Sequence, residues 1–142
     1  MQSGLKVSES AGKGRGVFAA RPFSSQEFVC CYIGDLVSAN EGKTRELQYE
    51  EGKGSFLYFF RHGEHEYCVD ATDEERYGGH YGRLINHSKQ KANVKAKVKI
   101  HNGLPHLVFY TLCPIKTNEE LLYDYQDSRP EAIKNFPWLK SS

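Results

Sequence analysis

The sequence lacks several features that would point to a function at once. It contains no apolar run of membrane-spanning length, no Cys-x-x-Cys spacing and no phosphate-binding loop of the Walker type. Neither charge dominates, because 19 basic residues are balanced by 18 acidic ones. The N-terminal residues also lack the pattern of a secretory leader. We therefore expect no membrane partner, no secretion and no general attraction to nucleic acid.

What remains is the composition of a small folded domain. Of the 142 residues, 39% are hydrophobic and 13% are aromatic, which is enough to bury a core. We expect one domain over residues 1–142, with a core at about residues 5–126. No histidine pair has a convincing third or fourth ligand, so no metal site is expected. The cysteines are expected to be small buried hydrophobic side chains in a reducing compartment: Cys30, Cys31, Cys68 and Cys113.

Most of the chain is predicted to form short β-strands. Strands are predicted at residues 5–8, 16–20, 27–33, 56–60, 67–70, 94–100 and 107–112. Turns at residues 61–64 and 102–103 would join two hairpins, the second with lysines on one face and apolar residues on the other. Helices are predicted only at residues 40–49, where Asn40 can cap, and at residues 130–136, with residues 77–81 as a loop. The expected fold class is therefore mostly β.

Two segments carry polar side chains among apolar neighbours. They are residues 82–88, with the pair Asn86-His87, and residues 121–125, with the tyrosines Tyr123 and Tyr125. Burying polar groups is costly unless something holds them in place, so we expect both segments to share one site. A third segment, Gly12-Lys13-Gly14-Arg15-Gly16, lets backbone amides approach a ligand and offers a cation for a carboxylate.

Read together, these segments resemble the SET-domain lysine methyltransferases. The motifs Gly-Arg-Gly-Val-Phe-Ala (14–19), Tyr-Ile-Gly-Asp (32–35), Arg-Leu-Ile-Asn-His-Ser (83–88) and Glu-Glu-Leu-Leu-Tyr-Asp-Tyr (119–125) occur in the family's order. Residues 67–72, 105–107 and 136–140 most resemble members that monomethylate lysine 20 of histone H4. The resemblance implies a SET-domain β-clip fold of small curled sheets, with a knot-like C-terminal crossing and a short closing helix within residues 127–142.

The resemblance also implies a cofactor and a set of site residues. The cofactor is S-adenosylmethionine, with S-adenosylhomocysteine as product and no metal. Residues implied to bind the cofactor are Lys13, Gly14, Arg15, Phe56, Arg83, Asn86, His87 and Trp138. Residues implied to bind substrate are Tyr32, Glu46, Tyr123 and Asp127.

Three tyrosines are implied to carry the reaction. Tyr125 would orient the amine, while Tyr32 and Tyr123 would line a lysine tunnel with little room for a methylated nitrogen, which implies monomethylation. The attacking lysine must be neutral, although its ordinary pKa is about 10.4. Desolvation beside a cationic cofactor lowers that pKa, so no carboxylate base is required. Alignment in a dry site is then the main help an enzyme can give.

Other interpretations stay open at this point. Cys31 stands where relatives have glutamate and Phe56 where they have tyrosine, so an inactive SET-fold module that binds a histone tail or another partner is the main alternative. A hydrolase that uses His87 and Ser88 is weak, because adjacent residues rarely reach each other as base and nucleophile.

The expected partner is the histone H4 tail or the nucleosome, with a monomeric domain in the nucleus. The lysines Lys89, Lys91, Lys95, Lys97 and Lys99 are either a solvated hairpin face or a contact for DNA phosphates.

Overall fold

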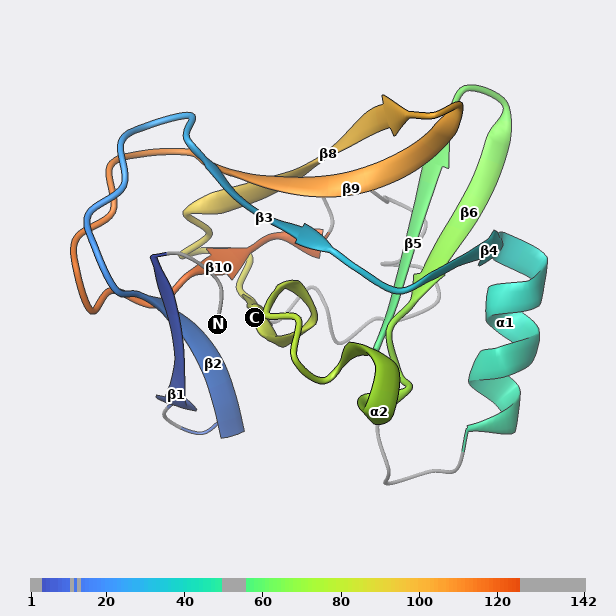
Figure 1. Ribbon diagram of the computed structural model, residues 1–142, viewed down its shortest axis with the longest axis horizontal. Coiled ribbons are helices and arrows are strands. Elements are labelled where there is room, and N and C mark those ends of the chain that lie inside the picture. The colour runs from blue at the N-terminus through green and yellow to red at the C-terminus, as the bar shows by residue number, and fades with distance from the viewer. Residues whose placement is uncertain (1–3, 11, 13, 50–55, 126–142) are drawn as a thin grey trace.

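The computed structural model describes residues 4–10, 12, 14–49 and 56–125. These residues form three small sheets, which curl around a shared core in Figure 1. The first sheet pairs β1 (Leu5–Ser10) with β2 (Gly14–Ala19). The second has the order β3 (Phe28–Tyr32), β9 (Leu104–Thr111), β8 (Val94–His101), β10 (Leu122–Tyr123) and β7 (Asn86–His87). The third has the order β4 (Asp35–Ser38), β6 (His65–Asp70) and β5 (Leu57–His62).

The mostly β prediction is confirmed, and both predicted hairpins form. β5 pairs with β6, and β8 pairs with β9 through a turn in which Asn102 and Gly103 have φ angles of 52° and 78°. The alternation along β8 holds for the lysines, which are exposed. It fails at Ile100, which is 53% exposed because the tip of this hairpin extends beyond the core. Strand β4 was not predicted.

The helices differ in detail from the prediction. α1 spans Ala39–Gln48, and its cap is Ser38 rather than Asn40, because the Ser38 hydroxyl accepts a hydrogen bond from the Glu41 amide at 3.1 Å. The short α2 (Glu74–Tyr77), capped by Asp73, was not predicted and includes the first residue of the expected loop. A short 3-10 helix, η1, follows at Gly82–Leu84. The predicted helix at residues 130–136 lies outside the described residues.

The cysteines are not all alike. Cys30 and Cys68 are buried as expected, and burial raises the pKa of the Cys30 thiol to about 12. Cys113 is exposed, so the expectation of burial is wrong there, because it lies in the connection that follows β9. In the described part of the chain, no helix is long and apolar enough to cross a membrane.

Candidate active site

Two distant segments of the chain cross at the β7 edge of the second sheet. β10 runs parallel to β7, with Tyr123 opposite His87, and parallel to β8, with Tyr123 opposite Val94. The C-terminal segment thus lies between the two ends of the loop formed by residues 88–93, which is the knot-like crossing expected of the fold. The Tyr125 amide then donates to Nδ1 of His87 at 3.1 Å. The two polar segments of the sequence therefore meet in one place.

Asn86 connects this crossing to the N-terminal hairpin. Its Nδ2 donates to the Arg15 carbonyl at 3.1 Å and to the Glu120 carboxylate at 3.0 Å. Glu120 also accepts from the Ser10 hydroxyl at 2.9 Å. A side chain at Gly16 would begin 2.5 Å from the Glu120 carboxylate and would have to displace it, so glycine lets β2 lie here without disturbing these hydrogen bonds. This network holds the Gly14-Arg15-Gly16 strand beside the Asn86-His87 pair.

The three tyrosines expected to act together lie in one aromatic cluster, and a fourth tyrosine joins them. Tyr58 of β5 stacks on Tyr125 with ring centroids 4.6 Å apart, and on Tyr123 at 5.7 Å. Its edge contacts Tyr32 at 5.3 Å. The Tyr125 hydroxyl accepts a hydrogen bond from the Phe59 amide at 2.5 Å and donates to the Phe59 carbonyl at 3.3 Å. Strands β3 and β5 and the C-terminal segment, which carries Tyr123 and Tyr125, therefore supply the cluster.

The hydroxyls of Tyr32 and Tyr123 stay protonated. Burial raises the pKa of Tyr32 well above its ordinary value, and Tyr125 and Tyr58 add to the effect. Burial also raises the pKa of Tyr123 well above its ordinary value, and the neighbouring Tyr58 and Tyr32 raise it further. Neutral phenols in a site with little water can hydrogen-bond an amine without removing its proton as a base.

Arg83, one of the residues predicted to bind the cofactor, is a buried cation. Its side chain is fully buried, its guanidinium lies 4.1 Å from the centre of the Phe56 ring, and Nη1 donates to the Ala71 carbonyl at 3.1 Å. Nη2 pairs with the Glu74 carboxylate, whereas Nε has no hydrogen-bond partner among the described residues. Burial lowers the pKa of Arg83, and the charge of Arg15 acts in the same direction. A buried donor without a partner fits a site built for a further polar ligand.

A glycine lets this segment lie against β3. A side chain at Gly82 would collide with the carbonyl of Cys31, and its nearest other neighbour would be the Cα of Tyr32. Because the close approach involves backbone atoms, no side-chain movement could relieve it. Gly82 therefore brings η1, with Arg83, next to the strand that carries Tyr32.

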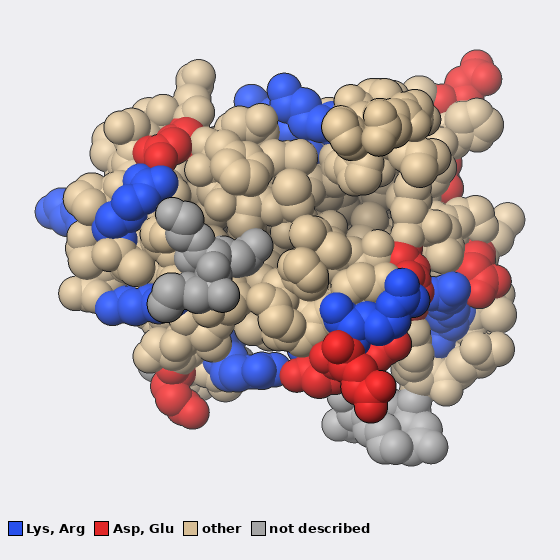
Figure 2. All heavy atoms as spheres, in the orientation of Figure 1, with Lys and Arg blue, Asp and Glu red and all other residues tan. Residues whose placement is uncertain are grey.

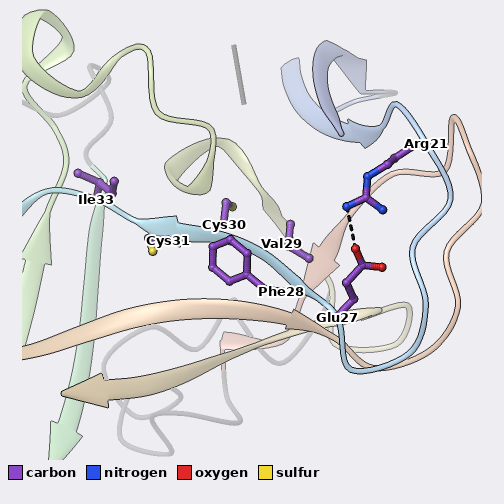
Figure 3. A pocket seen from close by; sticks show the side chains of 7 residues that line it. All are labelled: Arg21, Glu27, Phe28, Val29, Cys30, Cys31 and Ile33. Atoms are coloured by element: carbon purple, nitrogen blue, oxygen red, sulfur yellow. Dashed lines mark hydrogen bonds and ion pairs between the residues drawn. The ribbon is translucent and has the colours of Figure 1, made fainter. Parts of the chain in front are cut away.

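A groove lies along β3, and Cys31 points to the side of this strand opposite to that of Cys30 (Figure 3). Figure 3 shows that Cys30 and Cys31 point to opposite sides of this strand, as expected for neighbours in a strand. Cys31 is half-buried and lines a groove of about 510 Å³. The other residues that line it are Arg21, Glu27, Phe28, Val29, Cys30 and Ile33. Cys31 thus faces away from the core side of β3, which Cys30 occupies.

Not every predicted site residue joins the cluster. Glu46 lies on α1, and α1 packs on the face of the third sheet that carries Phe59 and Cys68, opposite to the face of Tyr58. The structure therefore does not bring Glu46 to the tyrosines. Three further predicted residues lie outside the described part of the chain: Lys13, Asp127 and Trp138.

Sequence reasoning missed two residues of the site. Tyr58 belongs to an apolar strand and looks like an ordinary core aromatic, so nothing in its neighbours marks it. Glu120 lies within the 119–125 motif, but its link to Asn86 depends on the crossing. The hydrolase interpretation finds no support, because the Ser88 hydroxyl accepts from the Lys91 amide at 3.1 Å and stabilises a turn. Among the described residues, no group of three or more His, Cys, Asp or Glu side chains could hold a metal ion.

Residues 14–126 match the family model described as "SET domain". The chain belongs to the SET-domain family. The crossing and the small curled sheets are accordingly those of a SET domain.

Several relatives of this SET domain are known. It is 45% identical over 138 residues to the histone-lysine N-methyltransferase Set8 of Drosophila melanogaster, covering 96% of this chain and 19% of that protein. It is 43% identical over 142 residues to the N-lysine methyltransferase KMT5A-A of Xenopus laevis, covering 99% of this chain and 41% of that protein. The chain thus spans about a fifth and two fifths of the lengths of these relatives.

Solved structures agree on the fold. The crystal structure of CpSET8 from Cryptosporidium has a TM-score of 0.79 and 37% sequence identity, over 88% of this chain and 58% of that chain. The polycomb repressive complex 2 of Chaetomium thermophilum contains a similar region, with a TM-score of 0.69 and 33% identity over 85% of this chain and 15% of that chain.

Proposed function

We propose that this SET domain transfers a methyl group from S-adenosylmethionine to a protein lysine, and that it monomethylates lysine 20 of histone H4. The names of two relatives, a histone-lysine N-methyltransferase and an N-lysine methyltransferase, support the reaction class. The observation that carries the proposal is the gathering of Tyr32, Tyr123 and Tyr125 beside His87. Neutral hydroxyls and ring faces are what a passage for an uncharged amine needs.

The cofactor would supply a methyl group on a positively charged sulfur and leave as S-adenosylhomocysteine. On our assignment, the unpartnered Nε of buried Arg83 donates to it. Gly14 has a φ of 76° and open space where a side chain would be, so the backbone beside Arg15 can approach a ligand. The residues assigned to cofactor binding are Lys13, Gly14, Arg15, Phe56, Arg83, Asn86, His87 and Trp138.

The tyrosines have separate tasks in this proposal. Tyr125 holds the amine in line with the donor, and its own hydroxyl is fixed by the Phe59 backbone. Tyr32 and Tyr123 accept hydrogen bonds from the amine, which aims its lone pair and excludes water. Both hydroxyls stay protonated, so neither acts as a base. The amine would lose its proton to solvent as it enters, because desolvation beside the cationic cofactor lowers its pKa.

The remaining assignments follow from the same proposal. Residues 1–142 act as a single SET domain, with a core at about residues 5–126 and a closing helix within 127–142. Asp127 and Glu46 contribute to binding of the H4 tail, Glu46 from the more distant α1. The domain works as a monomer on histone H4 or the nucleosome, in the nucleus.

Mass spectrometry of a peptide product tests the reaction and its product state. The wild-type domain is incubated with cofactor and an H4 tail peptide, and with a peptide in which arginine replaces lysine 20. Only the first peptide should gain a single methyl group. Tyr123→Phe should add dimethyl-lysine, because loss of a hydroxyl leaves room for a methylated nitrogen. Tyr110→Phe, a tyrosine of β9 with ring contacts to Phe28 outside the cluster, is the matched control and should leave the product unchanged.

The main rival function, binding without catalysis, has a distinct signature. A SET-fold module without activity would bind the H4 peptide in calorimetry, yet form no methylated product at any cofactor concentration. That result would contradict the proposed reaction. Cys31 and Phe56, which the resemblance sets where family members have glutamate and tyrosine, are the first residues to exchange for those types in that case.

We further propose that the basic face of β8 contacts nucleosomal DNA. Lys95, Lys97 and Lys99 are exposed on one face, and the ammonium groups of Lys97 and Lys99 lie 5.2 and 5.6 Å from the centre of the Tyr110 ring. Figure 2 shows basic side chains gathered at the upper edge of the molecule, over β8 and β9 in Figure 1.

Salt dependence tests this contact. Replacing the three lysines by Gln should weaken nucleosome binding and flatten its dependence on salt, because fewer counterions are released. Activity on the H4 peptide should not change. If the variant binds nucleosomes with the same salt dependence as the wild type, the proposed DNA contact is wrong and the basic face of β8 is a solvated surface.

A further inference from the structure

One tyrosine of the cluster has no role in the proposed function. Tyr58 is only 1% exposed and is among the largest fully buried side chains of the described residues. Its ring lies nearly parallel to those of Tyr125 and Tyr123, with interplanar angles of 18° and 21°, and at 66° to that of Tyr32. Among these four tyrosines, only Tyr58 has ring contacts to all the others.

The next residue of the same strand completes the arrangement. The Phe59 backbone makes two hydrogen bonds to the Tyr125 hydroxyl, while the ring of Tyr58 covers the face of the Tyr125 ring. Two consecutive residues of β5 thus fix the far end and the face of one tyrosine. β5 pairs with β6 along its whole length, so this support is part of a sheet and not of a loop. Positions held by regular sheet structure are more precise than positions held by loops.

We propose that Tyr58 is a positioning residue for methyl transfer, acting through the flat face of its ring on Tyr125 and Tyr123. This inference rests on the proposed function. Removing the ring lets Tyr125 tilt, and misplacement of about 1 Å can cost about a hundredfold in rate. It also lets Tyr123 retreat, which widens the passage and relaxes the limit to one methyl group. The hydroxyl of Tyr58 is not needed for this role, because stacking depends on the ring.

Three variants and one control test the inference. Tyr58→Phe keeps the ring, whereas Tyr58→Met and Tyr58→Leu fill most of the volume without a flat surface. The control is Phe60→Leu, on the same face of β5 two residues further on. Phe60 is 2% exposed and stacks on Tyr67 with ring centroids 5.5 Å apart. The substitution Phe60→Leu therefore removes a buried ring outside the cluster. Activity is expressed per mole of protein that binds cofactor in calorimetry, so that unfolded protein does not count.

The inference predicts a split between kcat and binding. Tyr58→Met and Tyr58→Leu should lower kcat on the H4 peptide by about ten- to a hundredfold and add dimethyl-lysine. Their cofactor Kd should stay within about twofold of wild type. Tyr58→Phe should restore kcat to within about threefold, and Phe60→Leu should keep kcat and the monomethyl product.

Two results would overturn the inference and leave the proposed function intact. One is a wild-type enzyme that methylates while Tyr58→Met, Tyr58→Leu and Phe60→Leu lose activity equally and form only monomethyl-lysine. The other is a Tyr58→Phe variant as impaired as Tyr58→Met, which would assign the effect to the hydroxyl. A wild-type domain that forms no product overturns the proposed function and, with it, the role of Tyr58.

Discussion

Asn93 is the side chain whose loss should most directly open the crossing of the C-terminal segment. It is 5% exposed, its Nδ2 donates to the Glu120 carbonyl at 2.9 Å, and its Oδ1 accepts from the Leu122 amide at 2.8 Å. Asn93→Ala removes these two hydrogen bonds, together with a longer one from Nδ2 to the Glu119 carboxylate at 3.5 Å, and deprives two backbone groups of their side-chain partner. Each such buried group costs about 1–3 kcal/mol, so the free energy of unfolding should fall by about 2–6 kcal/mol. That is a large share of the stability of a small domain, about 5–15 kcal/mol.

Urea unfolding followed by circular dichroism measures this effect. With a slope of about 2 kcal/mol per molar urea, a loss of about 3 kcal/mol lowers the midpoint by about 1.5 M. The matched control is Asn40→Ala on the exposed side of α1, which should change the unfolding free energy by less than about 0.5 kcal/mol. If Asn93→Ala stays within about 1 kcal/mol of wild type, the two hydrogen bonds do not hold the crossing and the reasoning is wrong.

Two further substitutions test the structure elsewhere: one removes a charge at Asp70, and the other adds a methyl group at Gly82. Burial alone would raise the pKa of Asp70, but hydrogen bonds, from Tyr49 at 2.5 Å and from Arg45 at 3.1 Å among others, outweigh it and lower that pKa. The stabilisation is therefore present above the ordinary Asp pKa of about 3.9 and is lost as the pH falls through the lower folded value. In Asp70→Asn, the free energy of unfolding from urea titrations should fall less steeply than in the wild type as the pH drops below about 4. The same pH dependence in both proteins would contradict this prediction. Gly82→Ala should cost about 1–3 kcal/mol by overpacking against the Cys31 carbonyl, and a neutral result by thermal unfolding would mean that η1 can move away.

The sequence predicted the architecture well where local rules apply. Alternation and turn residues predicted both hairpins, because side-chain direction in a strand depends on position alone. The cap of α1 was missed by two residues, since Ser38 and Asn40 are both good caps and the end of β4 decides between them. Exposure of Ile100 was missed because a pattern does not tell how far a hairpin extends past its core.

The site was predictable only in part, because motifs can be recognised in a sequence but the contacts between them cannot. The motifs around Asn86 and Tyr125 could be recognised, yet their pairing through His87 is a contact between residues 38 positions apart. Tyr58 could not be recognised, because its neighbours in the chain are also apolar or aromatic and its role depends on which rings face it.

By itself, the sequence determined a mostly β domain, its two long hairpins and the residue types of the site, since these follow from periodicity, turn chemistry and motif. Only the tertiary structure decided that β10 lies between β7 and β8, that Asn93 joins them, and that a ring from β5 completes the tyrosine cluster. The physical reason is that these contacts join residues far apart in the chain. Their partners are chosen by the packing of three sheets around one core, and no local pattern of side chains encodes that choice.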